Sequence, residues 1–245
     1  MVPENQLEDF VKRMRAAAGE NLASIILYGS AVAGDFHPEF SNLNLFCVLR
    51  DAGLPALQAV APAARWWGRQ KQPPPLFMTR QELERSTDVF AIELLDMTQH
   101  HRVLFGEEIL KGLEIPLRLH RVQVEYELRE KLLLLRQQLV LAAGDKRRLW
   151  DLLLRSAPSF VTLFRHALIA LGQPAPVSKR AAVQALAKEV RFDPSALDQV
   201  LDIRERKANP KKLDVQDLLA RYLTAVERVT AAVDHALGAD APARA

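Results

Sequence analysis

The sequence predicts an α+β protein, in which a β-sheet domain flanked by helices is followed by an all-helical bundle domain. Residues 1–115 alternate between helical and strand patterns, whereas residues 116–240 show only long helical patterns. The length of 245 residues and the hydrophobic content of 49% are those of a globular protein with room for two domains. Residues 241–245 are expected to form a disordered tail.

The sheet domain begins with a helix over residues 4–17, predicted by apolar residues at helical spacing. Apolar runs bounded by turn residues predict strands at residues 22–29, 43–50, 73–79 and 89–97. The third run starts with prolines, which suit an edge strand or the start of a strand. Further helical segments are expected at residues 54–70, 80–86 and 98–106. The last of these would carry His100 and His101 as a surface pair, since neighbours on a helix do not share a face.

The bundle domain is divided into helices by the stretches AAGD, GQPAPVS, RFDPS and KANPKKLD. Asp145, Ser178 and Asp214 each stand just before an apolar-periodic run, so each is a candidate N-cap. Two basic stretches, DKRRLWDLLLR and RERKANPKK, could contact phosphates or an acidic partner, although helix surfaces carry such residues for solubility as well.

Composition excludes several classes of protein. The net charge of +3 and the pI of about 9.1 allow an anionic ligand but do not support a nucleic-acid binder. The single cysteine, Cys47, excludes an internal disulfide and a cysteine-rich zinc site, and its apolar strand suits a buried thiol. The first residues lack the apolar core of a signal peptide, and no uncharged apolar run reaches the roughly 18 residues of a membrane span. We therefore expect a cytoplasmic protein without membrane contact.

The segment Leu27–Leu49, LYGSAVAGDFHPEFSNLNLFCVL, carries the chemical signal of the sequence. Gly29 allows close approach of the backbone to a ligand, and Ser30 adds a hydroxyl at a helix start, where unpaired N–H groups suit phosphate. A Gly-Ser turn is also common as a plain connection. On the following strand, Asn42 and Asn44 are two residues apart and therefore share one face.

This segment resembles the signature of the nucleotidyltransferase fold, shared by aminoglycoside and minimal nucleotidyltransferases and by polymerase β. The signature is a strand, a Gly-Ser turn and then Asp-x-Asp on the next strand. Gly34 and Ser41 also match it, and Gly34–Asp35 is expected to be a structural turn. The resemblance covers roughly residues 20–110 and implies a mixed β-sheet flanked by helices, with a bundle of the appended type.

The resemblance also implies a nucleoside triphosphate such as ATP as ligand, bound with Mg²⁺ ions that two aspartates and a third carboxylate hold. Here Asn42 and Asn44 replace the two aspartates, and Glu93 matches the third carboxylate on the predicted fourth strand. Amide oxygens can ligate magnesium but bring no charge, so the metal site is degenerate. Glu93 could still be a metal ligand or general base, or a strand residue that faces solvent.

Three functions stay open from the sequence. The first is a nucleotidyltransferase-like protein that is inactive or weakly active and binds a nucleotide at Gly29, Ser30, Asn42 and Asn44, in a cleft between sheet and bundle. The second is a working enzyme that moves a nucleoside monophosphate to a small-molecule or protein hydroxyl, with Glu93 and the asparagines serving one metal. The third is a non-catalytic scaffold that binds a protein partner or a second copy through its helical domain.

Overall fold

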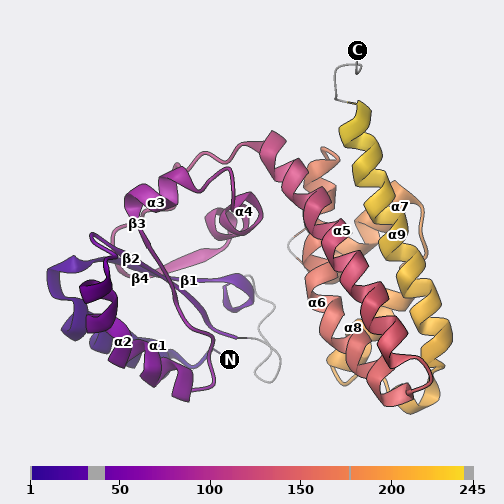
Figure 1. Cartoon of the computed structure of the whole chain (residues 1–245), viewed down its shortest axis with the longest axis horizontal. Coiled ribbons are helices and arrows are strands. Elements are labelled where there is room, and N and C mark those ends of the chain that lie inside the picture. The colour runs from indigo at the N-terminus through magenta and orange to yellow at the C-terminus, as the bar shows by residue number, and fades with distance from the viewer. Residues whose placement is uncertain (1, 33–41, 177, 240–245) are drawn as a thin grey trace. The chain divides into compact units, whose positions relative to one another are not determined.

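The computed structural model describes residues 2–32, 42–176 and 178–239, and the chain divides into two compact units, Met1–Pro116 and Leu117–Ala245 (Figure 1). Three residues of the sequence signal, Gly34, Asp35 and Ser41, lie outside the described residues. In the described part of the chain, no helix is both long and apolar enough to cross a membrane.

The first unit is a mixed β-sheet with helices on both faces. Its described elements are α1 (Glu4–Ala18), β1 (Leu22–Tyr28), β2 (Asn44–Leu49), α2 (Leu54–Arg69), β3 (Leu76–Thr79), α3 (Arg80–Arg85), α4 (Ala91–Gln99) and β4 (His101–Gly106), with short 3₁₀ turns at Gly19–Asn21 and Gly29–Ala31. The strand order is β3-β2-β1-β4, and β1 pairs antiparallel with both β2 and β4. β3 runs parallel to β2 at an edge, after its prolines. The predicted mixed sheet flanked by helices is confirmed.

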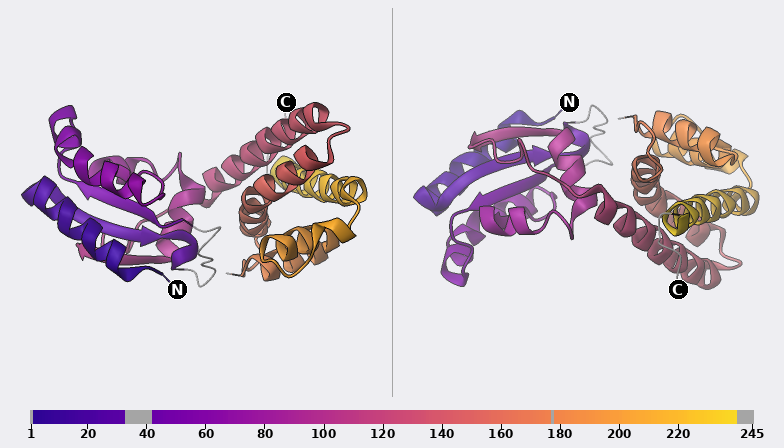
Figure 2. Two further views of the ribbon diagram at one scale, coloured as in Figure 1. Left: turned by 90° about the horizontal axis from the view of Figure 1, so that it is seen from below. Right: turned by 90° about the horizontal axis from the view of Figure 1, so that it is seen from above.

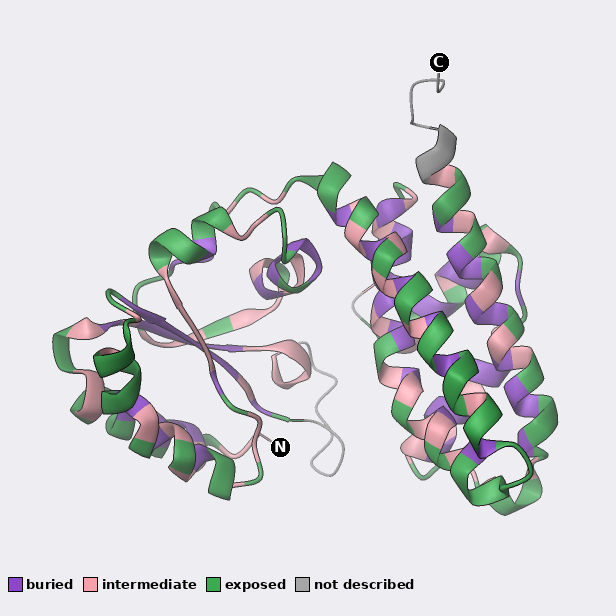
Figure 3. Cartoon of the chain, in the orientation of Figure 1, coloured by how far each residue is buried: buried purple, intermediate pink, exposed green. Residues whose placement is uncertain are grey.

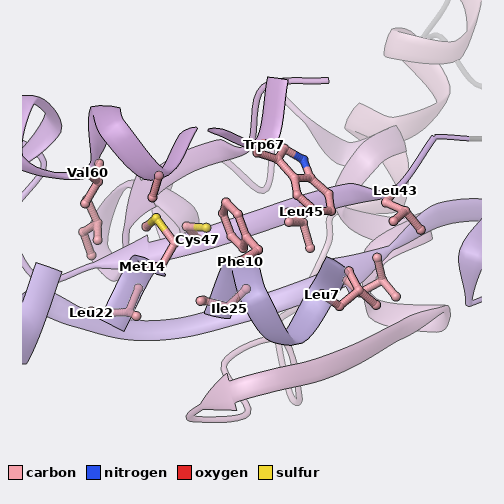
Figure 4. Close-up of a cluster of buried hydrophobic side chains, with 13 residues drawn as sticks. Leu7, Phe10, Met14, Leu22, Ile25, Leu43, Leu45, Cys47, Val60 and Trp67 are labelled. Carbon is pink, nitrogen blue, oxygen red and sulfur yellow. The ribbon is translucent and has the colours of Figure 1, made fainter. Parts of the chain in front are cut away.

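One face of the sheet is covered by α1 and α2 (Figures 1 and 2). Figure 4 shows Phe10 and Met14 of α1 and Trp67 of α2 packed over Ile25 and Cys47 of the sheet. The rings of Phe10 and Trp67 have centroids 5.0 Å apart. Burial raises the pKa of the Cys47 thiol, so this cysteine is an unreactive core residue, as its apolar strand predicts.

The opposite face is covered by α3, α4 and the segment that follows β4. Ile26, Phe46 and Val48 of the sheet contact Leu94 and Met97 of α4 in this second core. The central strand β1 is therefore buried on both faces and hydrogen-bonded along both edges. This arrangement explains why its sequence is an almost continuous apolar run rather than an alternating one.

Two elements predicted near the end of the first unit are wrong, because the predicted strand is a helix and the predicted helix is a strand. Residues 91–99 form helix α4 instead of a strand, and residues 101–106 form strand β4 instead of a helix. The apolar residues of α4 are buried at positions 91, 92, 94 and 97, which is helical spacing. Glu93 therefore lies in the first turn of a helix. The predicted helix-surface histidine pair is also wrong, since His100 is the C-cap residue that follows α4 and His101 begins β4.

The second unit is the predicted helical bundle. Its elements are α5 (Leu117–Ala142), α6 (Lys146–Ala170), α7 (Lys179–Val190), α8 (Ser195–Arg204), a 3₁₀ turn (Pro210–Lys212) and α9 (Val215–Ala239). Figure 3 shows buried residues between these helices and exposed residues along the outward side of α5.

The predicted N-caps of the bundle are confirmed in two of three cases. The Asp145 carboxylate accepts hydrogen bonds from the first backbone N–H groups of α6, at 3.0 and 3.1 Å. The Asp214 carboxylate accepts one from Gln216 at 2.8 Å. Ser178 occupies the N-cap position of α7, but its side chain makes no capping hydrogen bond, so this predicted cap is wrong in its chemistry.

A proline inside α6 removes one hydrogen bond of the helix, and a side chain from another helix replaces it. Pro158 has no N–H, so it cannot donate to the carbonyl of Leu154 one turn earlier. The guanidinium of Arg204, at the end of α8, donates to that carbonyl instead. This hydrogen bond connects α6 to α8. Burial lowers the pKa of Arg204.

The core of the bundle also contains a buried histidine pair. Nε2 of His120 on α5 lies 2.8 Å from Nδ1 of His166 on α6, and both side chains are completely buried. Burial, followed by electrostatic interactions with His166 and Arg121, lowers the pKa of His120 to about 4. His120 is therefore neutral in the folded protein at neutral pH.

Acid should destabilise the bundle through this histidine. Between the ordinary pKa of histidine and the lowered folded value, the unfolded chain binds the proton and the folded chain does not, so stability falls as the pH falls. We expect the free energy of unfolding in urea to drop by about 2 kcal/mol between pH 7 and pH 5. His120→Gln should flatten this dependence, whereas the same change at exposed His235 should leave it intact. An equal slope in both variants would contradict the assignment.

Candidate functional site

The candidate site begins where β1 ends. Tyr28 is the last residue of β1, and Gly29 starts the 3₁₀ turn that contains Ser30. Gly29 has φ +80°, and a Cβ at this position would lie 2.9 Å from Nδ2 of Asn44. The turn therefore needs glycine for two reasons, its left-handed backbone and the amide of Asn44 that lies directly against it.

A row of polar side chains crosses the sheet at this end. Tyr28 pairs with Asn44 of β2 on one side and with His101 of β4 on the other. Residues directly opposite one another in an antiparallel pair project from the same face. Asn44 has the strand parity of Phe46, and Phe46 belongs to the core beneath α4. The row Asn44–Tyr28–His101 therefore lies on the face of the sheet that α4 covers.

Helix α4 brings Glu93 to this row. Glu93 is exposed in the first turn of α4. Burial of the Tyr28 hydroxyl raises its pKa, and the negative charge of Glu93 raises it further. The carboxylate is thus close enough to Tyr28 to act on it electrostatically. The fourth-strand position predicted for Glu93 is wrong, and its role as metal ligand or catalytic base stays a prediction.

His101 is held on the other side of Tyr28 by two acceptors. Its Nδ1 lies 2.7 Å from the carbonyl oxygen of Met97, and its Nε2 lies 2.9 Å from the carboxylate of Glu108. Both partners are acceptors, so a ring nitrogen that carries a proton can donate to the partner that it faces. The pKa of the Glu108 carboxyl is lowered: partial burial would raise it, but the hydrogen bond and charge of His101 outweigh this effect. The two carboxylates thus act on different residues of the row Asn44–Tyr28–His101: Glu93 on Tyr28, and Glu108 on His101.

The two asparagines occupy different surroundings. Asn44 is half-buried at the start of β2, whereas Asn42 is exposed just before the strand. Leu43 between them is fully buried, and its N–H donates to Oε1 of Gln72 at 2.8 Å. Leu43 therefore faces the core, whereas the shared face of Asn42 and Asn44 stays a prediction, because β2 begins only at Asn44.

Several polar groups of the site have no hydrogen-bond partner among the described residues. Within the described parts of the chain, the side chains of Tyr28, Ser30, Asn42 and Asn44 have no hydrogen bond to other groups of the protein. These are two hydroxyls and two amides, which can donate to or accept from a polar ligand. Tyr28 and His101 were missed in the sequence because their place beside Asn44 depends on the pairing of β1 with both β2 and β4.

The donor set does not fit a pair of magnesium ions. Among the described residues, no group of three or more His, Cys, Asp or Glu side chains could hold a metal ion. Asn42 and Asn44 would offer neutral oxygens, and Glu93 would offer the one carboxylate that the fold's pattern leaves. Magnesium is usually held in proteins through carboxylates and substrate phosphates, so this set would compensate its charge poorly.

Comparison with known proteins identifies the architecture. No protein-family model matches the chain, and no curated protein matches it in sequence. A solved structure does match: spectinomycin adenyltransferase AAD(9) from Enterococcus faecialis, crystallised with ATP and spectinomycin. The TM-score is 0.57 at 14% sequence identity, over 96% of this chain and 99% of that chain. This chain has the nucleotidyltransferase fold. Because the match spans nearly the whole length of both proteins, sheet unit and bundle both belong to the shared architecture.

Proposed function

We propose that this protein binds a nucleotide at the Gly29–Ser30 turn and transfers it weakly or not at all. The observation that carries the proposal is the pair Asn42 and Asn44 in a fold whose turn at Gly29 is kept. The left-handed Gly29 and the hydroxyl of Ser30 suit the close approach of a phosphate. The adenyltransferase with the same fold was crystallised with ATP, which makes ATP the first ligand to test.

Weak transfer follows from the charges at the site. Phosphoryl and nucleotidyl transfer depend on positioning and on electrostatic stabilisation of the phosphate oxygens. Two neutral amides in place of two carboxylates hold metal ions far less well, which should remove several kcal/mol of that stabilisation. Glu93, on the adjacent helix, could compensate one metal ion but not two. The alternative is a working enzyme that transfers to a hydroxyl acceptor. It would require the carboxylate of Glu93 alone to hold the metal needed for transfer.

Calorimetric titration of ATP, with magnesium and with a chelator, distinguishes these functions. We expect weak binding that changes little between the two conditions, and no release of pyrophosphate. Strong binding with magnesium alone, accompanied by pyrophosphate release when hydroxyl compounds are added, would favour the working transferase. Absence of any binding would contradict the proposal.

Ser30→Ala tests the place of the phosphates. Loss of one hydroxyl that bonds an anionic ligand should weaken ATP binding about tenfold. Ser178→Ala is a matched control, because that side chain makes no capping hydrogen bond and stands in the other unit. Unchanged affinity in Ser30→Ala would remove the turn from the binding site.

A second candidate function, association through the bundle, is favoured by the surface of α5. The outward side of this helix exposes apolar residues at mostly seven-residue spacing: Leu119 (41%), Val122 (52%), Tyr126 (62%), Leu133 (57%) and Val140 (77%). Core residues such as Val124 and Leu128 occupy the opposite side of the same helix. Such a row on a water-facing surface is typical of a helix that meets another helix.

Self-association through this row is measurable. If a second copy covers it, light scattering should give a mass above 27.5 kDa that rises with concentration. The double change Tyr126→Glu and Leu133→Glu should return the protein to a monomer, because it places charges in the middle of the row. The same two charges at exposed Leu54 and Leu57 of α2 serve as control. A monomer at every concentration would exclude a second copy as the partner.

A further inference from the structure

A ligand-sized groove lies between α5 and α6, within the second unit. Its volume is about 630 Å³. Leucines from both helices line it, together with Phe160 of α6. Small-molecule sites in proteins usually have this volume and combine apolar walls with polar groups that orient the ligand. None of its residues belongs to the sheet unit that carries Gly29 and Asn44, so the groove is a separate feature.

The groove is long rather than round. It runs along α5 from Lys131 to Ala142, which is about 16 Å at the rise of an α-helix. Leu134 and Leu141 are two turns apart on this side, and Leu152 lines the facing side. This outline suits an extended apolar chain better than a compact ring system.

Cationic side chains stand along the groove. Lys131, Arg148 and Arg155 line it, against the single carboxylate of Asp151. Arg148 and Arg155 belong to the basic stretch that the sequence singled out. The other basic residues of that stretch, Lys146 and Arg147, do not line the groove.

Two of these three cations are paired with carboxylates, and the third, Arg155, has no partner among the described residues. Lys131 pairs with Glu127 at 3.0 Å, and Arg148 pairs with Asp145 at 3.4 Å. Arg155 has no ion pair or hydrogen bond with any described residue, and this includes Asp151 one turn before it. Ser159, one turn after Arg155, likewise has no hydrogen bond in the described chain and adds a hydroxyl to the lining.

Helix direction places these groups at one end. α5 and α6 run antiparallel, because a short connection of residues 143–145 joins them. Lys131 is far from this connection on α5, and Arg155 and Ser159 are far from it on α6. The end away from the connection therefore carries two cations and a hydroxyl beside Leu134, while Leu141, Leu152 and the ion-paired Arg148 line the part nearer to it.

We propose that this groove binds an organic anion with an extended apolar chain, such as an alkyl carboxylate. Arg155 and Ser159 bind the anionic head, Lys131 adds charge, and Leu134, Leu141 and Leu152 contact the chain. A guanidinium presents a planar fork that matches a carboxylate, which gives the head a defined place. Burial of the chain between the helices provides the remaining affinity.

Calorimetric titration of dodecanoate, below its micelle concentration, into the full chain tests the proposal. We expect saturable binding of one molecule per chain, and much weaker binding of dodecanol, which has the same chain without the charge. Arg155→Ala should weaken dodecanoate binding about tenfold, and Arg155→Lys, which keeps the charge, should weaken it less. Arg147→Ala is the matched control on the same helix and should bind as the natural protein does.

Other outcomes would overturn the proposal. No saturable binding of dodecanoate, equal affinity for dodecanol, or an equal loss in Arg147→Ala would each exclude an anion site at Arg155. The test is independent of the nucleotide site, since Arg155→Ala should leave the ATP titration unchanged. Leu152→Glu provides a second probe, because a carboxylate at the wall should repel the ligand while Arg155 stays in place.

Discussion

Replacing Asn42 and Asn44 together by aspartate is expected to make ATP binding depend on magnesium. The change is nearly isosteric, so Asn44→Asp can keep its place against Gly29 while it adds a negative charge. With Glu93 on α4, the site would then offer three carboxylates for metal ions and triphosphate. We expect affinity for magnesium-ATP to rise about a hundredfold, and affinity for ATP with chelator to fall, since the added charges repel the free anion. Calorimetry under both conditions measures the two changes.

A control variant carries the same two charges elsewhere. Asn5 is exposed on α1, and the side-chain oxygen Oδ1 of Asn209 accepts a hydrogen bond from the backbone N–H of Lys211, a role that an aspartate also fills. Aspartates at these two positions should leave ATP binding unchanged. If the doubly restored protein binds magnesium-ATP no better than this control, the asparagines are not what weakens the site. If neither protein binds ATP, association through α5 becomes the better account of the molecule.

Gly106→Ala should be among the most destabilising single changes in the sheet unit. A Cβ at Gly106 would lie 2.0 Å from the carbonyl oxygen of Ala23, and the residue has φ +81°. The strands cannot separate easily here, because the Ser24 hydroxyl donates to the carbonyl oxygen of Glu107 at 2.8 Å and lies 3.2 Å from that of Phe105. We expect a loss of about 3–5 kcal/mol in the free energy of unfolding, measured in urea.

Gly112→Ala separates the two causes of this loss. Gly112 has φ +82°, but a Cβ there would meet no atom within 4 Å. Its substitution should cost only the left-handed backbone, about 1–2 kcal/mol. A similar loss in both variants would mean that β1 and β4 move apart at Gly106 without much cost.

The sequence predicts the frame of the molecule well where periodicity is unambiguous. The long helices of the bundle, the first three strands and the capping aspartates follow from patterns that one segment contains by itself. The region from Val89 to Gly106 fails because VFAIELLDM is a short apolar run, which suits a buried strand and a buried helix equally. The free edge of β1 is defined only after β2 and β3 have been placed on its other side. Which of the two segments pairs with that edge therefore depends on the whole sheet and not on the local sequence.

The candidate site shows the same division. Gly29, Ser30, Asn42 and Asn44 can be predicted as candidates from the sequence because they lie close together in it. His101 and Tyr28 become neighbours only through the pairing of β4 with β1. Glu93 is predicted from its resemblance to a motif on a strand, but the structure places it on helix α4, so its position is wrong and its role stays a prediction.

The position of β1 has a consequence for how a ligand would be detected. Its middle residues, Ile25–Leu27, are bonded to strands on both sides and covered on both faces, so their amide hydrogens should exchange with solvent only when the unit unfolds as a whole. A ligand that binds the folded unit lowers the population of that open state in proportion to its saturation. Occupancy of the turn at Gly29 would therefore be recorded as slower hydrogen exchange deep inside the sheet, at amides that the ligand never touches.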